Sequence, residues 1–309
     1  MPPPDKVVLE HAGALGDFLL AWPFFLSLAR HFREVPIHQA VPAAHAPFLA
    51  PWARPCPPDI RRALDARFAG EAWPTALENT LVVRPGLGKR PPVADSPWFW
   101  FAPGLTPGSD ISPAEHYRQA LDARGIAFAA DFAGVFRQHF GGHAPRGDTV
   151  LLFPGAGHTD KAWPLGRFEQ LAALLRERGL RPVFVIGPVE RDRGLDLGES
   201  DIVEPQNLEA LSRVLCAARF ALGPDSGPMH LAGLHGVPGL ALFGPTSPRQ
   251  WGPFGLDVVT AGLACAPCTA VTSGAFAPGC QRPLPCLAGL TAEGILTRLE
   301  GLGLVAGRP

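Results

Sequence analysis

The sequence has almost no net charge and no long apolar run, and each shortage excludes a class of protein. Its 27 basic and 28 acidic residues leave a formal net charge of −1 and are spread through both halves. We therefore expect no basic face for nucleic acid, and any anion should bind at a local site. The longest apolar stretch, Phe18 to Ala29, is interrupted by Pro23 and Ser27 and is too short to span a bilayer.

Signs of export are also missing. The N-terminal residues MPPPDKVVLE lack the charged and apolar regions of a secretory signal. We expect a cytoplasmic protein, for which peripheral contact with the inner face of the membrane stays open. For its six cysteines, a reduced or metal-bound state is then favoured over disulfides.

Length and composition favour two domains. A chain of 309 residues with 47% apolar residues can bury two cores of ordinary size. The best linker is the polar, glycine-rich stretch 141–148. We therefore predict one domain at 1–145 and a second at 146–309.

The second half alternates strands with helices. Such alternation predicts a parallel sheet covered on both faces, with ligands bound in the loops after the strand carboxyl ends. The predicted strands are 149–153, 182–186, 220–222 and 239–243, and the predicted helices are 165–178, 208–219 and 228–234.

The loop after the first of these strands, 153–164, suits a phosphate ligand. Gly155 and Gly157 let the backbone approach an oxygen-rich group, and Thr159 offers a hydroxyl. Lys161 offers a mobile charge for a diphosphate, and it is one of only three lysines beside 24 arginines. The alternative is a surface turn with a solvated lysine.

A second loop, Gly223 to His230, joins a strand to a helix that begins near Pro228. A helix amino terminus favours an anion, and we expect outward-facing amides from Ser226, Gly227 and Met229. Alternatively, Asp225 or Ser226 only caps the helix, and His230 is a packed core histidine. A third loop, 243–248, is a plausible wall of the same pocket.

The first half opens with a strand at 6–10, a glycine loop ending at Gly16, and a helix from Asp17 to about Phe32. Asp17 follows a strand end, where a catalytic carboxylate can lie, but it can equally be an N-cap. A strand at 80–84 and a helix at 114–124 follow.

As an ordered set, these segments resemble the heptosyltransferases, glycosyltransferase family 9. The resemblance implies an α/β GT-B fold, with two Rossmann-like domains whose parallel sheets face a central cleft. It also implies an inverting transfer of a sugar, heptose by default, from an ADP-sugar to a lipopolysaccharide-core or related glycan. The matching segments are GALGD, FPGAGHTDKAWPLGRF, NLEALSRVLCAARF, GPDSGPMHLAG and LFGPTSP.

The resemblance also assigns roles. Asp17 matches a proposed general base, Lys161 a lysine on the donor phosphate, and Glu209 an acid on the donor ribose. The remaining donor-binding candidates are Gly16, Gly155, Gly157, Thr159, Asp225, Ser226, Gly227, Pro228 and His230. The chain has no Asp-x-Asp pair to hold a cation, so we expect transfer without a required cofactor.

The segment between residues 35 and 110 departs from the family pattern. A strand followed by an acidic or amide residue is usual there, whereas this chain has Arg84, followed by Lys89 and Arg90. These three cations are candidates for binding an acidic acceptor, or else form a solvated basic loop. The divergence motivates two alternatives: a nucleotide-sugar-binding protein without transferase activity, or a transferase that uses another sugar nucleotide.

Four cysteines gather late in the chain. Cys265 and Cys268 form a Cys-x2-Cys pair, and Cys280 and Cys286 follow. This spacing suggests a structural metal site, although many such clusters are only buried thiols.

Overall fold

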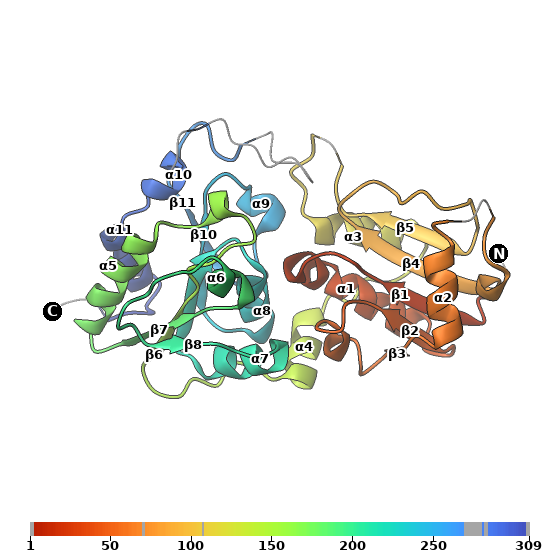
Figure 1. Ribbon diagram of the computed structural model, residues 1–309, viewed down its shortest axis with the longest axis horizontal. Helices are drawn as coiled ribbons and strands as arrows, with labels where there is room; N and C mark the ends of the chain where they lie inside the picture. The colour runs from red at the N-terminus through yellow and green to blue at the C-terminus, as the bar shows by residue number, and fades with distance from the viewer. Residues whose placement is uncertain (1–2, 70–71, 107, 269–279, 281–283, 307–309) are drawn as a thin grey trace. The chain divides into compact units, whose positions relative to one another are not determined.

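The computed structural model describes residues 3–69, 72–106, 108–268, 280 and 284–306. The chain divides into two compact units, Met1–Phe132 and Ala133–Pro309, and each contains one parallel sheet (Figure 1). Within the described residues, no helix has the length and apolar character needed to cross a membrane.

The division lies before helix α4 (Phe132–Phe140), ahead of the glycine-rich stretch chosen as a linker from the sequence. That stretch is bonded to the second unit. The N–H groups of His143, Ala144 and Arg146 donate to the carbonyls of His235, Cys216 and Ala217, respectively. Its polar residues therefore run along this unit as an ordered segment.

The first sheet has the strand order β3-β2-β1-β4-β5, and every neighbouring pair is parallel. Its strands are β1 (Lys6–Glu10), β2 (Ile37–Ala40), β3 (Arg54–Pro55), β4 (Thr80–Gly86) and β5 (Phe99–Pro103). Helices α1 (Leu15–His31) and α3 (Pro113–Asp122) pack together. Helix α2 (Pro58–Ala66) packs with Val8 and Val82 in a separate cluster. The 3₁₀ turns of this unit are η1 (Ala46–Phe48) and η2 (Thr75–Leu77).

Helix α1 accounts for the longest apolar run of the sequence. Every residue from Phe18 to Ala29 is buried, so this run forms core within the first unit. Pro23 lies inside the helix, and the Ser27 hydroxyl donates to the Pro23 carbonyl at 2.7 Å.

The second sheet has the order β11-β10-β9-β6-β7-β8, again parallel throughout. Its strands are β6 (Thr149–Leu152), β7 (Arg181–Val185), β8 (Ile202–Val203), β9 (Phe220–Pro224), β10 (Gly239–Phe243) and β11 (Asp257–Thr260). The main helices are α5 (Leu165–Arg176), α7 (Leu208–Ala217), α8 (Gly227–His235) and α11 (Ala292–Gly301). The short elements are η3 (Thr159–Lys161), α6 (Pro188–Asp192), α9 (Pro248–Trp251) and α10 (Pro285–Ala288).

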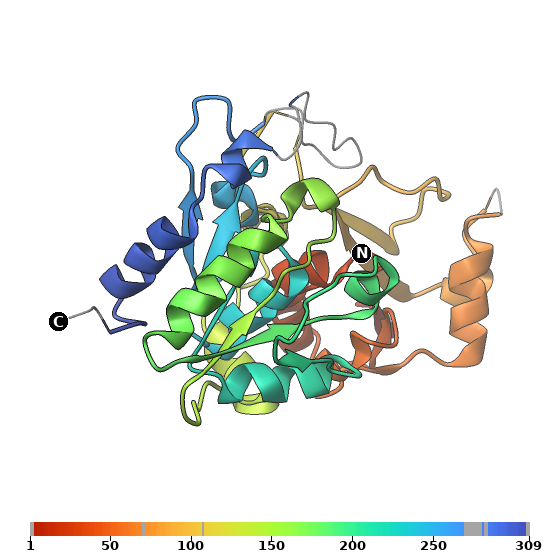
Figure 2. The ribbon, with the colours of Figure 1, turned by 60° about the vertical axis from the view of Figure 1, so that its left-hand side comes forward.

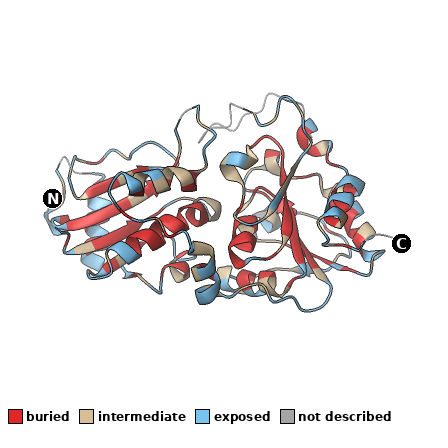
Figure 3. Cartoon of the chain, turned by 180° about the vertical axis from the view of Figure 1, so that it is seen from behind, coloured by how far each residue is buried: buried red, intermediate tan, exposed pale blue. Residues whose placement is uncertain are grey.

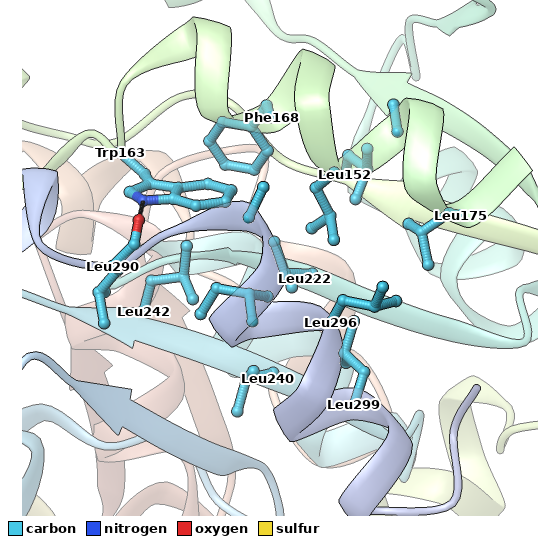
Figure 4. Close-up of a cluster of buried hydrophobic side chains, with 14 of the residues drawn as sticks. Leu152, Trp163, Phe168, Leu175, Leu222, Leu240, Leu242, Leu290, Leu296 and Leu299 are labelled. Atoms are coloured by element: carbon cyan, nitrogen blue, oxygen red, sulfur yellow. Dashed lines mark hydrogen bonds between the residues drawn. The ribbon is translucent and has the colours of Figure 1, made fainter. Parts of the chain in front are cut away.

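Helices cover both faces of the second sheet, so its strands are nearly all apolar. Figures 1 and 2 show α5 and α11 together on one face and α7 and α8 on the other. Strands β9 and β10 are buried along their whole length (Figure 3). Between the sheet and α5 and α11, the Trp163 indole N–H donates to the Leu290 carbonyl at 2.9 Å (Figure 4).

Both sheets contain a point at which the chain reverses its direction of travel across the sheet. In the first it lies between β1 and β4, and in the second between β6 and β9. Ligands of such sheets bind outside the carboxyl ends of the strands at this switch point. The two places to search for chemistry are therefore the loops after β1 and β4 and those after β6 and β9.

Candidate functional site

At the switch point of the second sheet, the two most suggestive loops meet through an ion pair. Lys161 ends the turn η3 after β6, and Asp225 directly follows β9. The Lys161 Nζ lies 2.9 Å from the Asp225 Oδ2, with the two side chains 22% and 7% exposed. Lys161 is therefore not the freely solvated lysine of the alternative interpretation.

The amino end of α8 lies beside this pair. Ser226 is the N-cap residue, but its hydroxyl makes no capping hydrogen bond. Among the described residues, no backbone carbonyl accepts the N–H groups of Ser226 and Gly227. Met229 differs from the prediction, because its N–H donates to the Ser226 carbonyl at 3.1 Å. The Met229 N–H is therefore bonded within the first turn of the helix, which contains Pro228, and does not point outward.

Three buried polar atoms, two in the first turns of α8 and one in the loop after β10, lack a hydrogen-bond partner in the described part of the chain. They are Ser226 Oγ, His230 Nδ1 and Thr246 Oγ1. Burial lowers the pKa of His230 to about 4, with Asp225 raising it and Lys161 lowering it further, so the imidazole is neutral at pH 7. Unsatisfied buried polar groups are costly, and a polar ligand would satisfy them. Thr246 was not singled out in the sequence, although its loop was.

The two glycines of the loop after β6 have different surroundings. A Cβ at Gly155 would collide with the Glu190 carboxylate, whereas a Cβ at Gly157 would meet nothing within 4 Å. Glu190 also accepts the Gly187 N–H at 2.9 Å, and Arg193 donates to the Ala156 carbonyl at 3.1 Å. Gly155 therefore makes room for a protein side chain. Glu190 and Arg193 were not predicted as site residues, because nothing in their spacing shows that they contact this loop.

Two other donor-site candidates are exposed side chains. Glu209 is an exposed residue in the first turn of α7, whose N-cap Asn207 accepts the Ala210 N–H at 2.8 Å. No contact recorded among the described residues joins Glu209 to Lys161 or Asp225. Thr159 is exposed at the start of η3.

In the first unit, Asp17 is half-buried in the first turn of α1. The N-cap residue is Ala14, which makes no side-chain cap, so Asp17 is not the cap that the alternative interpretation required. A Cβ at Gly13 would lie 2.8 Å from the His11 Cε1 and 3.0 Å from the Asp17 Oδ2. Gly13 thus allows these two side chains to approach, and Gly16 lies within the same helical turn.

The three candidate acceptor cations differ in their surroundings. Arg84 lies in β4, and its Nη1 is 3.2 Å from the Glu10 carboxylate. Lys89 is exposed. Arg90 pairs with the exposed Asp95 at 3.0 Å and lies 5.4 Å from the centre of the Phe99 ring.

The late cysteines are all free thiols, with Cys265 and Cys280 exposed and Cys286 buried. The pKa of Cys268 and of Cys286 is raised, first by burial and then by the neighbouring thiols. Among the residues that the structure describes, no three or more histidine, cysteine or acidic side chains are placed to hold a metal ion. The predicted metal site thus has no support here.

The comparisons with known proteins agree with one another and with the family resemblance seen in the sequence. The family model of glycosyltransferase family 9 (heptosyltransferase) matches residues 113–274. Lipopolysaccharide heptosyltransferase 1 of Escherichia coli K12 is 26% identical over 172 residues, 53% of this chain and 48% of that protein. Its Pseudomonas aeruginosa counterpart is 33% identical over 159 residues, 49% and 44% of the two chains. The aligned region thus spans about half the length of these relatives.

One solved structure of similar fold is an E. coli heptosyltransferase with ADP-2-deoxy-2-fluoro heptose. Its TM-score is 0.63 at 20% identity, covering 96% of this chain and 99% of that one. The likeness extends over both sheets.

Proposed function

Because the chain belongs to glycosyltransferase family 9, the heptosyltransferases, we propose that it moves heptose from ADP-heptose to a hydroxyl of a lipopolysaccharide-core glycan. The observation that carries this proposal is the Lys161–Asp225 pair beside the open amino end of α8. The E. coli structure with an ADP-heptose analogue supports the same donor class.

The donor site combines three features that suit a diphosphate. Lys161 supplies a mobile charge, and the Ser226 and Gly227 amides lie at a helix amino end. The buried hydroxyls of Ser226 and Thr246 have no hydrogen-bond partner among the described residues. On binding, the diphosphate would share Lys161 with Asp225. The same groups would stabilise the negative charge that develops on the leaving diphosphate. Glu209 as the ribose ligand remains a prediction from family resemblance.

The acceptor hydroxyl would be activated by Asp17. Its proton passes to the Asp17 carboxylate while its oxygen forms a bond to the anomeric carbon. The bond from that carbon to the diphosphate oxygen breaks, and ADP leaves with the electron pair. A single displacement inverts the anomeric centre. Orientation and proton removal are the protein's contributions on this side.

We assign acceptor binding to the N-terminal domain, predicted as 1–145, and donor binding to the C-terminal domain, predicted as 146–309. We further propose that transfer requires no divalent cation, since Lys161 and the α8 amides supply the positive potential. Activity should then survive EDTA. A structural metal at the late cysteines stays a separate prediction, which elemental analysis of protein purified without chelator tests.

A cytoplasmic enzyme, in peripheral contact with the membrane when its acceptor is a glycolipid, fits this proposal. The competing function is a nucleotide-sugar-binding protein without transfer, and a transferase for another sugar nucleotide is the third candidate. Calorimetry with ADP-heptose, UDP-glucose and GDP-mannose identifies the donor. Mass spectrometry of reactions with lipopolysaccharide-core acceptors then detects the product. Donor binding without a product from any acceptor would favour the binding protein.

A further inference from the structure

The first unit contains a buried tyrosine whose hydroxyl is unpaired. Tyr117 is the only tyrosine of the chain, lies in the middle of α3 and is 1% exposed. Its hydroxyl makes no hydrogen bond with any residue that the structure describes. An unpaired buried hydroxyl lowers stability, and a phenylalanine of the same shape would avoid that cost. The hydroxyl therefore needs an explanation beyond the packing of its ring.

The Tyr117 ring lies between helix α1 and the carboxyl end of β5. Its centre is 5.4 Å from the centre of the Phe24 ring on α1. A Cβ at Gly104, the residue directly after β5, would collide with the Tyr117 hydroxyl oxygen. The Gly104 N–H in turn donates to the Gly86 carbonyl at the end of β4, at 2.8 Å. The hydroxyl thus lies at the carboxyl edge of the first sheet, where a glycine leaves room for it.

The proposed base Asp17 lies near the same edge. Asp17 and Phe24 are both in α1, seven positions apart, so they share the side of that helix on which Phe24 contacts the Tyr117 ring. Helices α1 and α3 pack against each other. The pKa of Tyr117 is raised by burial and further by the charge of Asp17, so the two groups are close together. Tyr117 therefore keeps its proton at neutral pH and can donate it in a hydrogen bond.

A histidine also approaches Asp17, from the other side of Gly13. A Cβ at Gly13 would lie 2.8 Å from the His11 Cε1 and 3.0 Å from the Asp17 Oδ2. The His11 Nδ1 already accepts the Gly13 N–H at 3.2 Å. Burial, with contributions from His45 and Arg84, lowers the pKa of His11 to about 3. His11 is thus neutral at the pH of the reaction, and its Nδ1 is already engaged.

From these contacts we propose that Tyr117 is a positioning residue for Asp17, with a hydroxyl that donates to one carboxylate oxygen while the other oxygen takes the proton of the acceptor hydroxyl. The inference rests on the proposed function and adds a residue to it. The Tyr117 proton stays on its own oxygen throughout. Such hydrogen bonds are often long in a free enzyme and tighten when the substrate binds. This one would orient the carboxylate and favour its ionised form.

The competing explanation is that Tyr117 only fills the core beside Phe24. Tyr117→Phe separates the two, because it removes the hydroxyl and keeps the ring. We expect kcat for acceptor-dependent ADP release from ADP-heptose to fall about 10-fold, as for loss of a hydrogen bond to a charged group. The KM for ADP-heptose should be retained. The acid limb of kcat/KM should move to higher pH by about 0.5–1 unit, since the ionised carboxylate loses a donor.

Stability and a matched variant control this result. Tyr117→Phe should unfold at the same or a higher temperature than wild type, because the hydroxyl is unpaired in the free protein. Ser212→Ala, on α7 in the second unit, removes another buried hydroxyl without a partner among the described residues. It should leave both the rate and the acid limb unchanged.

A spectroscopic measurement tests the contact without relying on activity. Because the chain has one tyrosine, labelling with 3-fluorotyrosine places a single type of ¹⁹F probe at position 117. Its resonance should shift as the pH is lowered from about 8 to about 4, and Asp17→Asn should remove most of that shift. Asp122→Asn, at an exposed carboxylate that pairs with Arg118 on the same helix, should leave the shift in place.

Wild-type kcat in Tyr117→Phe, or an acid limb that does not move, would overturn the positioning role. The same ¹⁹F titration in wild type and Asp17→Asn would overturn the contact itself. If wild type forms no product with lipopolysaccharide-core acceptors while the ¹⁹F titration depends on Asp17, the proposed function fails and the contact between Tyr117 and Asp17 stands.

Discussion

At the scale of single residues, the central feature of the proposed donor site is the ion pair between Lys161 and Asp225, which a bound diphosphate would have to share. Asp225 is buried and its partner Lys161 is partly exposed, so the lysine can turn toward a diphosphate while the carboxylate stays in place. Breaking the pair from either side leaves a different group unsatisfied. Its two partners therefore have separable effects on binding and stability.

Lys161→Ala should weaken ADP binding by about 10- to 100-fold, the value of a charge-assisted contact. It should also lower the free energy of unfolding by about 1–3 kcal/mol, because Asp225 is left buried without its cation. Calorimetry and chemical unfolding measure the two effects. The double variant Lys161→Ala with Asp225→Asn should recover stability but not affinity. Unchanged ADP affinity in Lys161→Ala would return the lysine to a structural role.

Four buried histidines, His11, His45, His230 and His235, have a pKa lowered by burial and so make stability depend on pH. Burial lowers the pKa of His11 to about 3, with His45 and Arg84 contributing, and that of His230 to about 4. Below about pH 6.5 these histidines bind protons in the unfolded chain but stay neutral in the folded chain. The free energy of unfolding that they contribute is therefore fully present above about pH 6.5 and decreases as the pH falls toward 4. Each histidine contributes a slope of up to about 1.4 kcal/mol per pH unit.

In chemical unfolding experiments, the free energy of unfolding should therefore fall by about 2 kcal/mol less in His11→Gln than in wild type between pH 7.5 and pH 5. His31→Gln, at an exposed position on α1, serves as the matched control and should follow wild type. Parallel pH profiles for wild type and His11→Gln would contradict the assignment of a neutral, buried imidazole.

At the scale of elements, the loop after β6 contains two glycines with opposite requirements. Gly155→Ala should lower the melting temperature, because the added methyl collides with Glu190. Adding Glu190→Ala should restore much of the loss. Gly157→Ala meets open space, so stability should change by less than about 0.5 kcal/mol. Its ADP affinity should fall if the backbone approaches the diphosphate there, and wild-type affinity would exclude that approach.

Helices and strands whose apolar residues recur with a clear period were predictable from the sequence, and those that depend on distant contacts were not. The strand at 6–10 and the strand at 239–243 have the predicted limits, and the helix expected at 165–178 is α5. Between residues 35 and 110 only the strand at 80–84 was predicted, because prolines and short strands obscure the rest of the pattern. The elements β2, β3, β5 and α2 were therefore not anticipated.

The site shows the same limit. Lys161 and Asp225 could be selected because each follows a strand in a glycine-rich loop. Their pairing could not be predicted, because it joins residues 64 positions apart. The ion pairs of Glu10 with Arg67 and Arg84 likewise join distant parts of the chain, and Arg67 had no motif to mark it.

At the scale of the whole molecule, the chain repeats one arrangement. Each unit is a parallel sheet with a switch point, and each switch point has a charged cluster: Lys161 with Asp225 in one, Arg84 with Glu10 in the other. We propose that the first of these clusters binds the diphosphate of the donor. In the proposed mechanism, Asp17, in the first turn of α1, removes the proton from the acceptor hydroxyl.

The proposed mechanism is tested most directly by the rate of acceptor-dependent ADP release from ADP-heptose, compared between wild type and Asp17→Asn. Asparagine preserves size and polarity and removes basicity. We predict that ADP affinity and melting temperature are retained while the rate falls by about 10²-fold or more, as for loss of a general base. The helix-capping role is already excluded, since Ala14 is the N-cap. Release at the wild-type rate by Asp17→Asn, with the acceptor that wild type glycosylates, would contradict the account.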